Sequence, residues 1–192
     1  MAKGTKDLNS PQSWQITPQW TLFLDRDGVI NRKIDNSYVL SWSQFIFSEG
    51  AVQAIKRLTT VFGRIVGVTN QQGIGKGLMT NDDFSLLMRQ MADEIHAAGG
   101  KISTFYYCPH LENARCTCRK PRTGMARQAK QDFPDINFSQ SVMVGDSISD
   151  MRFGRNLDMK TVFITNNSPF PHPHAHLIDA HFPSLETFAD AL

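Results

Sequence analysis

The stretch TLFLDRDGVIN (residues 21–31) runs from apolar residues directly into two carboxylates, and the fold prediction starts from it. Its first residues do not alternate between apolar and polar, so the segment has no polar face that would be exposed to solvent. Such a run is typical of a strand buried on both faces of a parallel sheet. Asp25 follows it directly and Asp27 comes two residues later. The stretch therefore predicts a buried strand with acidic side chains at its carboxyl end.

Further apolar runs of the same kind recur along the chain. They cover residues 63–70, 141–146 and 160–167, with an additional candidate at 101–108. Between them lie helical patterns: residues 80–98, for example, carry apolar side chains at helical spacing and end at two glycines. Strands that alternate with helices predict an α/β, doubly wound (Rossmann-like) fold with a parallel sheet of about five strands.

Size and composition are those of an ordinary globular protein. The 192 residues are 41% hydrophobic and 20% charged, and the formal net charge is +2. This charge gives no reason to expect a nucleic acid or a membrane surface as partner, and we expect a monomer that meets only a small molecule. No apolar run is of signal-peptide or membrane-spanning type, so the cytoplasm is the expected compartment. No repeat or linker divides the chain, which predicts a polar N-terminal arm over 1–20 and a single domain over 21–192.

Polar side chains end several of the predicted strands. Asp25, Thr69 with Asn70, and Asp146 all stand at carboxyl ends, where ligands bind in open α/β sheets. Clustered carboxylates repel one another, so Asp25, Asp27 and Asp146 predict a bound cation, and their oxygen ligands favour Mg²⁺. A carboxylate beside Mg²⁺ can attack phosphorus when the metal and a lysine neutralise the phosphoryl oxygens. A second carboxylate, less tightly held, would protonate the leaving oxygen and later activate water.

The stretch YYCPHLENARCTCRKP (106–121) contains all three cysteines of the chain. Cys108, His110, Cys116 and Cys118 supply three thiolates and one imidazole, a complete tetrahedral ligand set for Zn²⁺. Four protein ligands leave no open position, so we expect a structural zinc and not a catalytic one. Cys-x-Cys also differs from the Cys-x-x-Cys spacing of redox pairs. Because Lys120 comes two residues after the last ligand, the zinc would hold the loop from which this lysine reaches the site.

Four segments in order resemble the motifs of haloacid-dehalogenase (HAD) superfamily phosphatases. These segments are FLDRDGVIN, VTN, CRKP and VGDSISD, and the resemblance extends from Leu22 to Ile164. It implies that Asp25 is the nucleophile and forms an aspartyl-phosphate, and that Asp27 is the general acid and base. It also implies Mg²⁺ held by the side chains of Asp25 and Asp146 and the backbone carbonyl of Asp27. Thr69 and Lys120 would stabilise the transferring phosphoryl group.

Within the superfamily, the chain resembles subfamily IIIA, which has a minimal cap and a zinc-binding loop. Members act on heptose 1,7-bisphosphate, removing the 7-phosphate, or on histidinol phosphate; TNQQGIGKG and CRKPRTGM favour the sugar, whereas the short cysteine loop resembles the histidinol-phosphate group. Ser147 stands where many heptose enzymes have lysine. The expected substrate contacts are Asn70, Gln71, Gln72, Arg119, Asp35, Asn36 and Tyr38. The expected substrate is D-glycero-D-manno-heptose 1,7-bisphosphate, with histidinol phosphate as the alternative. Two further alternatives remain open: a zinc-stabilised binding module without catalysis, and a phosphotransferase that uses another acceptor.

Two other patterns carry less weight. GIGKG (73–77) resembles a phosphate-binding loop, but Gly77 stands where Ser or Thr is required and position 70 is not glycine. Histidine occupies every second position at His172, His174 and His176, a spacing that could bind a metal. The prolines between them predict an irregular surface segment instead.

Overall fold

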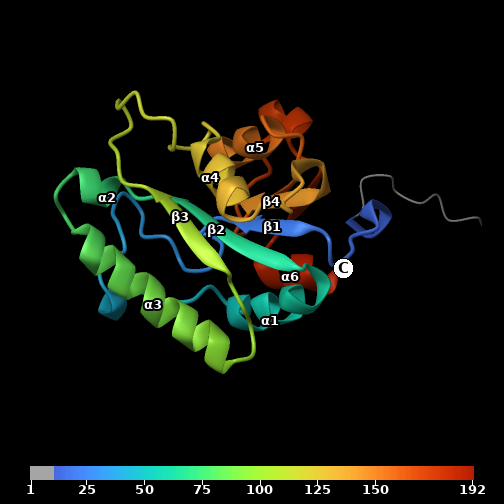
Figure 1. Ribbon diagram of the computed structural model, residues 1–192, viewed down its shortest axis with the longest axis horizontal. Helices are drawn as coiled ribbons and strands as arrows, with labels where there is room; N and C mark the ends of the chain where they lie inside the picture. Colours follow the sequence, from blue (N-terminus) through green and yellow to red (C-terminus); the bar gives the residue numbers. More distant parts are fainter. Residues whose placement is uncertain (1–10) are drawn as a thin grey trace, which may run out of the picture.

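The computed structural model describes residues 11–192, and within them the chain forms a six-stranded, all-parallel sheet (Figure 1). The spatial order of the strands is β3-β2-β1-β4-β5-β6, with β1 in the middle. The strands are β1 (Thr21–Leu24), β2 (Arg64–Asn70), β3 (Thr104–Cys108), β4 (Ser141–Gly145), β5 (Lys160–Ile164) and β6 (Ala180–Phe182). The α/β doubly wound prediction is confirmed, and the short strand β6 comes in addition to those read from the sequence.

Helices cover both faces of the sheet. In Figure 1, α4 and α5 lie above it and α1, α3 and α6 lie below it. The helices are α1 (Ala51–Val61), α2 (Gln72–Gly75), α3 (Asn81–Ala97), α4 (Gly124–Asp132), α5 (Ile148–Arg155) and α6 (Leu185–Asp190). Short 3-10 turns complete the chain: η1 (Pro11–Trp14), η2 (Trp42–Gln44), η3 (Phe138–Gln140) and η4 (His172–Leu177).

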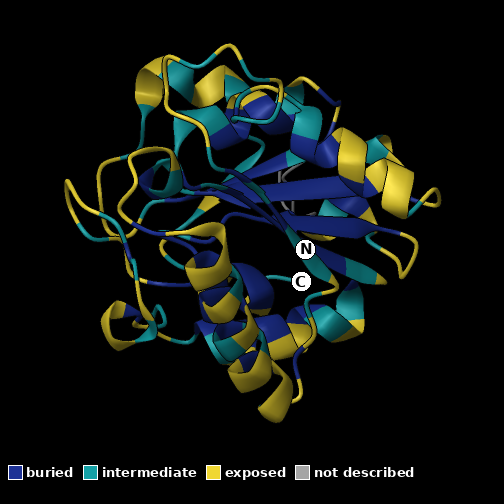
Figure 2. Ribbon diagram, turned by 60° about the vertical axis from the view of Figure 1, so that its left-hand side comes forward, coloured by how far each residue is buried: buried dark blue, intermediate teal, exposed yellow. Residues whose placement is uncertain are grey.

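The first strand shows why its run of apolar residues needs no alternation. Leu22 and Leu24 pack into the core layer between the sheet and the helices α1 and α3, while Phe23 packs into the layer that includes residues of α4 and α5. All three side chains are fully buried, as Figure 2 shows for the central strands. A strand covered on both faces has no solvent side, so these three successive positions are all apolar.

Helix α5 begins at a capping box that also shapes the site. The Ser147 hydroxyl accepts from the backbone N–H of Asp150, and the Asp150 side chain accepts from the backbone N–H of Ser147. This pairing satisfies two N–H groups that a helix start leaves without partners. It also fixes Asp150 immediately behind the end of β4.

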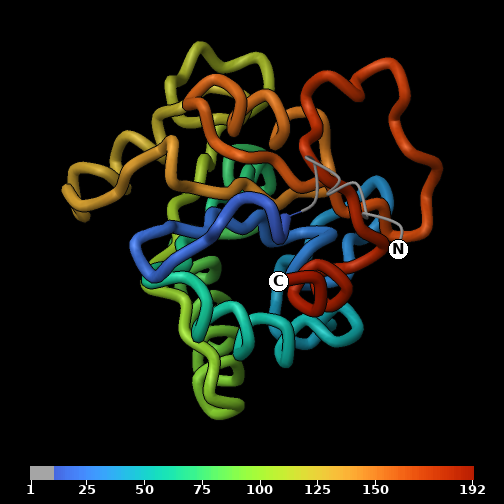
Figure 3. Tube along the Cα trace, turned by 90° about the vertical axis from the view of Figure 1, so that its right-hand side faces the viewer, coloured from blue at the N-terminus to red at the C-terminus, as the bar shows by residue number. Residues whose placement is uncertain are grey.

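The predicted N-terminal arm lies partly outside the described residues, since 1–10 are not among them. In the remainder of the arm, Trp14 and Trp20 are buried in the core. We therefore propose that the folded domain includes the part of the predicted arm from Pro11 onward. At the other end, Figure 3 shows the segment between β5 and β6 (orange to red) as a wide excursion of the trace. No helix within residues 11–192 is long and apolar enough to cross a membrane.

Candidate active site at the strand ends

The carboxyl ends of β1, β2 and β4 meet around one hollow of about 240 Å³. Asp25 directly follows β1, and its backbone N–H donates to the carbonyl of Val144 in β4 at 2.9 Å. The hollow is lined by most of the residues predicted from the sequence: Asp25, Asp27, Tyr38, Thr69, Asn70, Arg119, Lys120 and Asp146. The parallel topology thus brings together side chains that are up to 121 positions apart along the chain (146 − 25).

Lys120 lies at the bottom of this hollow, with a side chain only 2% exposed. Its ammonium contacts a carboxylate oxygen of Asp25 at 2.8 Å and one of Asp150 at 2.6 Å. It also donates to the backbone carbonyl of Val68 at 2.7 Å. Burial opposes the positive charge, but the carboxylates of Asp150 and Asp25 outweigh it and raise the pKa of Lys120. The lysine is therefore a permanent positive charge beside Asp25.

Asp25 is one of three clustered carboxylates that have too little positive charge beside them for all three. Asp25, Asp146 and Asp150 each bring an oxygen within 4.8 Å of the others. Burial raises the pKa of Asp25 to about 8, with further help from the negative charges of Asp150 and Asp146 and against the pull of Lys120. Burial and the charge of Asp150 likewise raise the pKa of Asp146. Such carboxylates favour a cation, because its charge would restore their ionised forms. The donor set, all oxygen, suits Mg²⁺.

Asp27 is held more firmly than the sequence suggested. One guanidinium nitrogen of Arg26 contacts both of its oxygens, at 2.7 and 2.8 Å, and the side-chain amides of Asn31 and Gln71 donate to it at 3.0 and 2.9 Å. Burial opposes its charge, but Arg26 and these two amides together hold the pKa of Asp27 below its usual range. The expectation of a loosely held second carboxylate is therefore corrected: three side chains orient it.

Arg26 was not among the predicted site residues. It is 1% exposed, lies over the ring of Phe84 at 5.7 Å, and has two guanidinium nitrogens without a hydrogen-bond partner. A buried arginine between two acidic residues could have been read from DRDG as a partner for one of them. Its choice of Asp27, and not Asp25, depends on the bend of the chain after β1.

The three residues that follow Thr69 form hydrogen bonds to other residues that line the hollow. The amide of Asn70 pairs with the backbone of Lys120: it accepts from the N–H at 3.0 Å and donates to the carbonyl at 3.3 Å. Gln71 donates to Asp27 and to the hydroxyl of Thr69. Gln72 donates to the Tyr38 hydroxyl at 3.0 Å and accepts from the backbone of Glu112 in the cysteine loop. Their predicted contacts with substrate remain predictions, and their observed contacts position catalytic candidates.

The other predicted substrate contacts fall into two groups. Tyr38 and Arg119 line the hollow, and one guanidinium nitrogen of Arg119 is buried without a partner. Asp35 lies instead in a neighbouring hollow, and Asn36 is exposed with a left-handed φ of 54°. The structure thus places the first pair, and not the second, beside Asp25.

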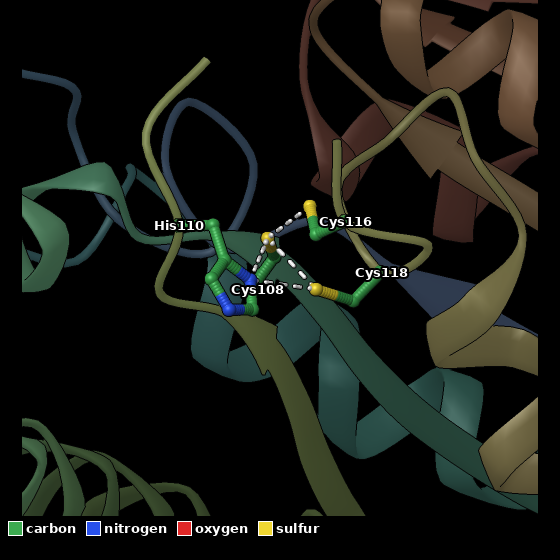
Figure 4. A group of neighbouring side chains, drawn as sticks. All are labelled: Cys108, His110, Cys116 and Cys118. Carbon is green, nitrogen blue, oxygen red and sulfur yellow. Dashed lines mark hydrogen bonds between the residues drawn. The ribbon is translucent and has the colours of Figure 1, made fainter. Parts of the chain in front are cut away.

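Cys108, His110, Cys116 and Cys118 face a common point (Figure 4). The sulfur of Cys108 lies 3.7 Å from that of Cys116 and 3.0 Å from that of Cys118, and Nδ1 of His110 lies 3.1 Å from the Cys118 sulfur. All three thiols are free. A tetrahedral zinc with bonds of about 2.3 Å needs sulfurs a little under 4 Å apart. The separation of Cys108 and Cys116 matches this value, and Cys118 would have to move outward from Cys108 to complete the ligand set. Arg122 supports the loop by donating to the carbonyl of Cys116 at 2.7 Å.

The histidine-rich segment does not form a comparable cluster. Among residues 11–192, only the cysteine loop and the aspartates around Asp25 bring His, Cys, Asp or Glu ligand atoms together in this way. His172, His174 and His176 lie in and around the 3-10 turn η4 on the surface, as the prolines predicted.

Comparisons with known proteins agree with this geometry. A family described as HAD-hydrolase-like matches residues 117–191. A D-glycero-alpha-D-manno-heptose-1,7-bisphosphate 7-phosphatase from Mycobacterium bovis is 40% identical over 174 residues, which cover 91% of this chain and 92% of that protein. The chain belongs to the HAD-like phosphatases. The resemblance inferred from the four motifs is thereby confirmed, and with it the class of reaction, hydrolysis of a phosphate monoester.

Other members of this phosphatase family are similar over most of their length. A D-glycero-beta-D-manno-heptose-1,7-bisphosphate 7-phosphatase from Helicobacter pylori is 34% identical over 161 residues, covering 83% of this chain and 91% of the relative. Among solved structures, a D,D-heptose 1,7-bisphosphate phosphatase from B. bronchiseptica, complexed with magnesium and phosphate, superimposes with a TM-score of 0.78. It is 27% identical, and the match covers 88% of this chain and 96% of that one.

Proposed function

We propose that this HAD-like phosphatase removes the 7-phosphate of D-glycero-D-manno-heptose 1,7-bisphosphate with Mg²⁺ and through an aspartyl-phosphate on Asp25. The observation that carries the proposal is the buried pair of Asp25, directly after β1, and Lys120, in the loop between β3 and α4, whose side chains are 2.8 Å apart. It provides a nucleophilic oxygen next to a fixed positive charge, in a site largely shielded from water. The substrate is proposed from the relatives in Mycobacterium bovis and Helicobacter pylori, which are both named as heptose-1,7-bisphosphate 7-phosphatases.

In the proposed reaction, a carboxylate oxygen of Asp25 forms a bond to phosphorus while the bond from phosphorus to the sugar oxygen breaks. Asp27 gives its proton to that leaving oxygen. Arg26, Asn31 and Gln71 hold Asp27 ionised in the free protein, so the negative charge of the bound phosphate must first raise its pKa and Asp27 must take up a proton from solvent. In the second step Asp27 accepts a proton from water, whose oxygen attacks phosphorus and releases Asp25.

Two metals fit the side chains present. Mg²⁺ would be held by the side chains of Asp25 and Asp146 with the carbonyl of Asp27, and bound there it would neutralise phosphoryl charge. Zn²⁺ would be held by the cysteine loop, and Lys120 follows that loop directly. The Thr69 hydroxyl would donate to a phosphoryl oxygen, and the fixed charge of Lys120 would lie beside the phosphoryl group. The expected monomer remains a prediction, which light scattering on the purified protein would check.

The relatives also favour one anomer of the sugar. The relatives from Mycobacterium bovis and Campylobacter jejuni, both 40% identical, are named as acting on the alpha form. Those named for the beta form, from Helicobacter pylori and Pasteurella multocida, are 34% and 37% identical. We therefore propose the alpha anomer as the preferred substrate.

A substrate comparison tests the proposal. With Mg²⁺ present, we expect the alpha bisphosphate to be hydrolysed about tenfold or more faster than the beta form, measured as kcat/KM from released phosphate. Histidinol phosphate should be a poor substrate, and its preferential turnover would reverse the assignment. Stoichiometric release of inorganic phosphate also separates hydrolysis from transfer to another acceptor.

A second prediction concerns the zinc loop. Cys116→Ser should bind less zinc and lose activity by about tenfold to a hundredfold, because Lys120 would no longer be held in register with Asp25. Zinc content measured by atomic emission, together with the phosphate-release assay, checks both parts. Asn113→Ser is the matched control, since this exposed residue lies in the same loop and is not a ligand.

Mg²⁺ binding by Cys116→Ser, measured by calorimetry, should be unchanged, because the carboxylates at the ends of β1 and β4 do not belong to the loop. Full activity in a protein that contains no zinc would show that the loop needs no metal to hold Lys120.

A further inference from the structure

Lys33 lies at the border between the hollow that contains Asp25 and a neighbouring one of about 540 Å³. Its ammonium contacts a carboxylate oxygen of Asp146 at 3.3 Å, and these two residues line both hollows. The Lys33 side chain is 56% exposed, whereas that of Asp146 is 10% exposed. A flexible cation therefore lies on a carboxylate that is predicted to bind Mg²⁺.

The residue before Lys33 has an anchored backbone, in contrast to the exposed side chain of Lys33. The N–H of Arg32 donates to the carbonyl of Ile46 at 2.8 Å, and the Asn31 amide donates to the carbonyl of Arg32 at 2.9 Å. The side chain can therefore move its ammonium over the mouth of the site while its base stays in place.

The other positive charges near Asp25 have little capacity left for a phosphate. An ammonium has three donors, and those of Lys120 already face Asp25, Asp150 and the carbonyl of Val68. Arg26 is buried and turned toward Asp27. Among the described residues that line the hollow, this leaves Arg119 and Lys33, and only Lys33 reaches the carboxylate edge of the site.

The residue after Asp146 supplies no charge either. The hydroxyl of Ser147 is engaged with Asp150 at 2.6 Å and with Ser149 at 2.8 Å, within the cap of α5. A positive charge on this side of the site has to come from another part of the chain, and Lys33 is placed to provide it.

We propose that Lys33 is a mobile phosphate-binding residue, which pairs with Asp146 in the free protein and moves to the oxygens of the reacting phosphate when a divalent cation binds Asp146. The cation and the ammonium compete for the same carboxylate, so cation binding releases the lysine at the place where the phosphate dianion arrives. This inference rests on the proposed function, because it assumes that a phosphate group binds over Asp25.

The test uses the full-length protein with Lys33→Met, which keeps the chain length but removes the charge, and Lys33→Arg, which keeps the charge. Calorimetry measures Mg²⁺ binding without phosphate and then inorganic phosphate binding at saturating Mg²⁺; steady-state assays give kcat and KM. Lys101→Met is the control. This exposed lysine precedes the amino end of β3, whereas the site lies at the carboxyl ends of the strands.

For Lys33→Met we expect phosphate affinity to fall about tenfold, as for loss of one charge-assisted hydrogen bond. KM should rise by a similar factor, with kcat changed less than about threefold. Mg²⁺ affinity without phosphate should rise about twofold to fivefold, because a competing exposed ion pair is gone. Lys33→Arg should retain most of the phosphate affinity, and Lys101→Met should match the wild type in every measurement.

Unchanged phosphate affinity in Lys33→Met would overturn the proposal. Weaker Mg²⁺ binding would also overturn it, because it would mean that Lys33 supports Asp146 and does not compete for it. Failure of the proposed function has a different signature: the wild type would bind Mg²⁺ and phosphate with the predicted dependence on Lys33 but would not hydrolyse heptose bisphosphate.

Discussion

Asp25→Asn should lower the rate of phosphate release by at least about a thousandfold, because an amide cannot form the aspartyl-phosphate. The replacement has nearly the same shape, and its oxygen can still accept from the backbone N–H of Arg26, which now donates to Asp25 at 2.8 Å. The assay is phosphate release from heptose bisphosphate at saturating Mg²⁺. Retention of more than about a tenth of the activity would show that another group attacks phosphorus.

The same variant separates a lost nucleophile from a damaged fold. Burial raises the pKa of Asp25 to about 8, well above the ordinary value of 3.8. Between these values the folded protein binds a proton that the unfolded chain has released, so this group costs stability as the pH rises from about 4 to about 8. The amide of the variant does not titrate, so cation-free Asp25→Asn should be at least as stable as the wild type at pH 7. Thermal unfolding measures this, with Asp93→Asn, an exposed position on α3, as the control.

Lys120→Met should damage both stability and activity. The ammonium is the shared partner of Asp25, Asp150 and the carbonyl of Val68, and its loss leaves buried acceptors without a counter-charge. Removing one partner of a buried pair costs about 3–5 kcal/mol, so the free energy of unfolding in denaturant should fall by that amount. Activity should fall about a hundredfold or more, because the phosphoryl charge in the transition state would lose the fixed positive charge beside Asp25.

A double variant separates the loss of stability from the loss of activity. Adding Asp150→Asn to Lys120→Met removes the fully buried carboxylate that the single change leaves unpaired, while its oxygen can still accept in the cap of α5. We expect much of the stability to return and the activity to stay low. If activity returned together with stability, Lys120 would be a structural residue and its assignment to the phosphoryl group would be wrong.

Much of the fold could be predicted because strands buried on both faces appear in the sequence as runs of apolar residues. The apolar runs around Leu22, Val66 and Val144 do not alternate, and each became a central strand covered on both faces. Strand β6 was missed because its three residues, Ala180–Phe182, are too short and too exposed to carry that pattern. The buried tryptophans of the N-terminal segment were missed for a related reason, since polar neighbours concealed them.

The candidate site also has features that the sequence predicted and features that only the tertiary structure shows. The sequence by itself determined the chemical groups: acidic residues after β1 and β4, Thr69 at the end of β2, and four candidate zinc ligands before Lys120. Each of these groups lies within one short segment. Only the tertiary structure decided the pairings, because they join segments far apart in the chain. Arg26 holds Asp27, Asn70 holds the backbone of Lys120, and Lys33 reaches Asp146 across 113 positions. Local sequence dictates which groups a strand delivers to its end, but contacts between them depend on sheet order and on the direction of each buried side chain.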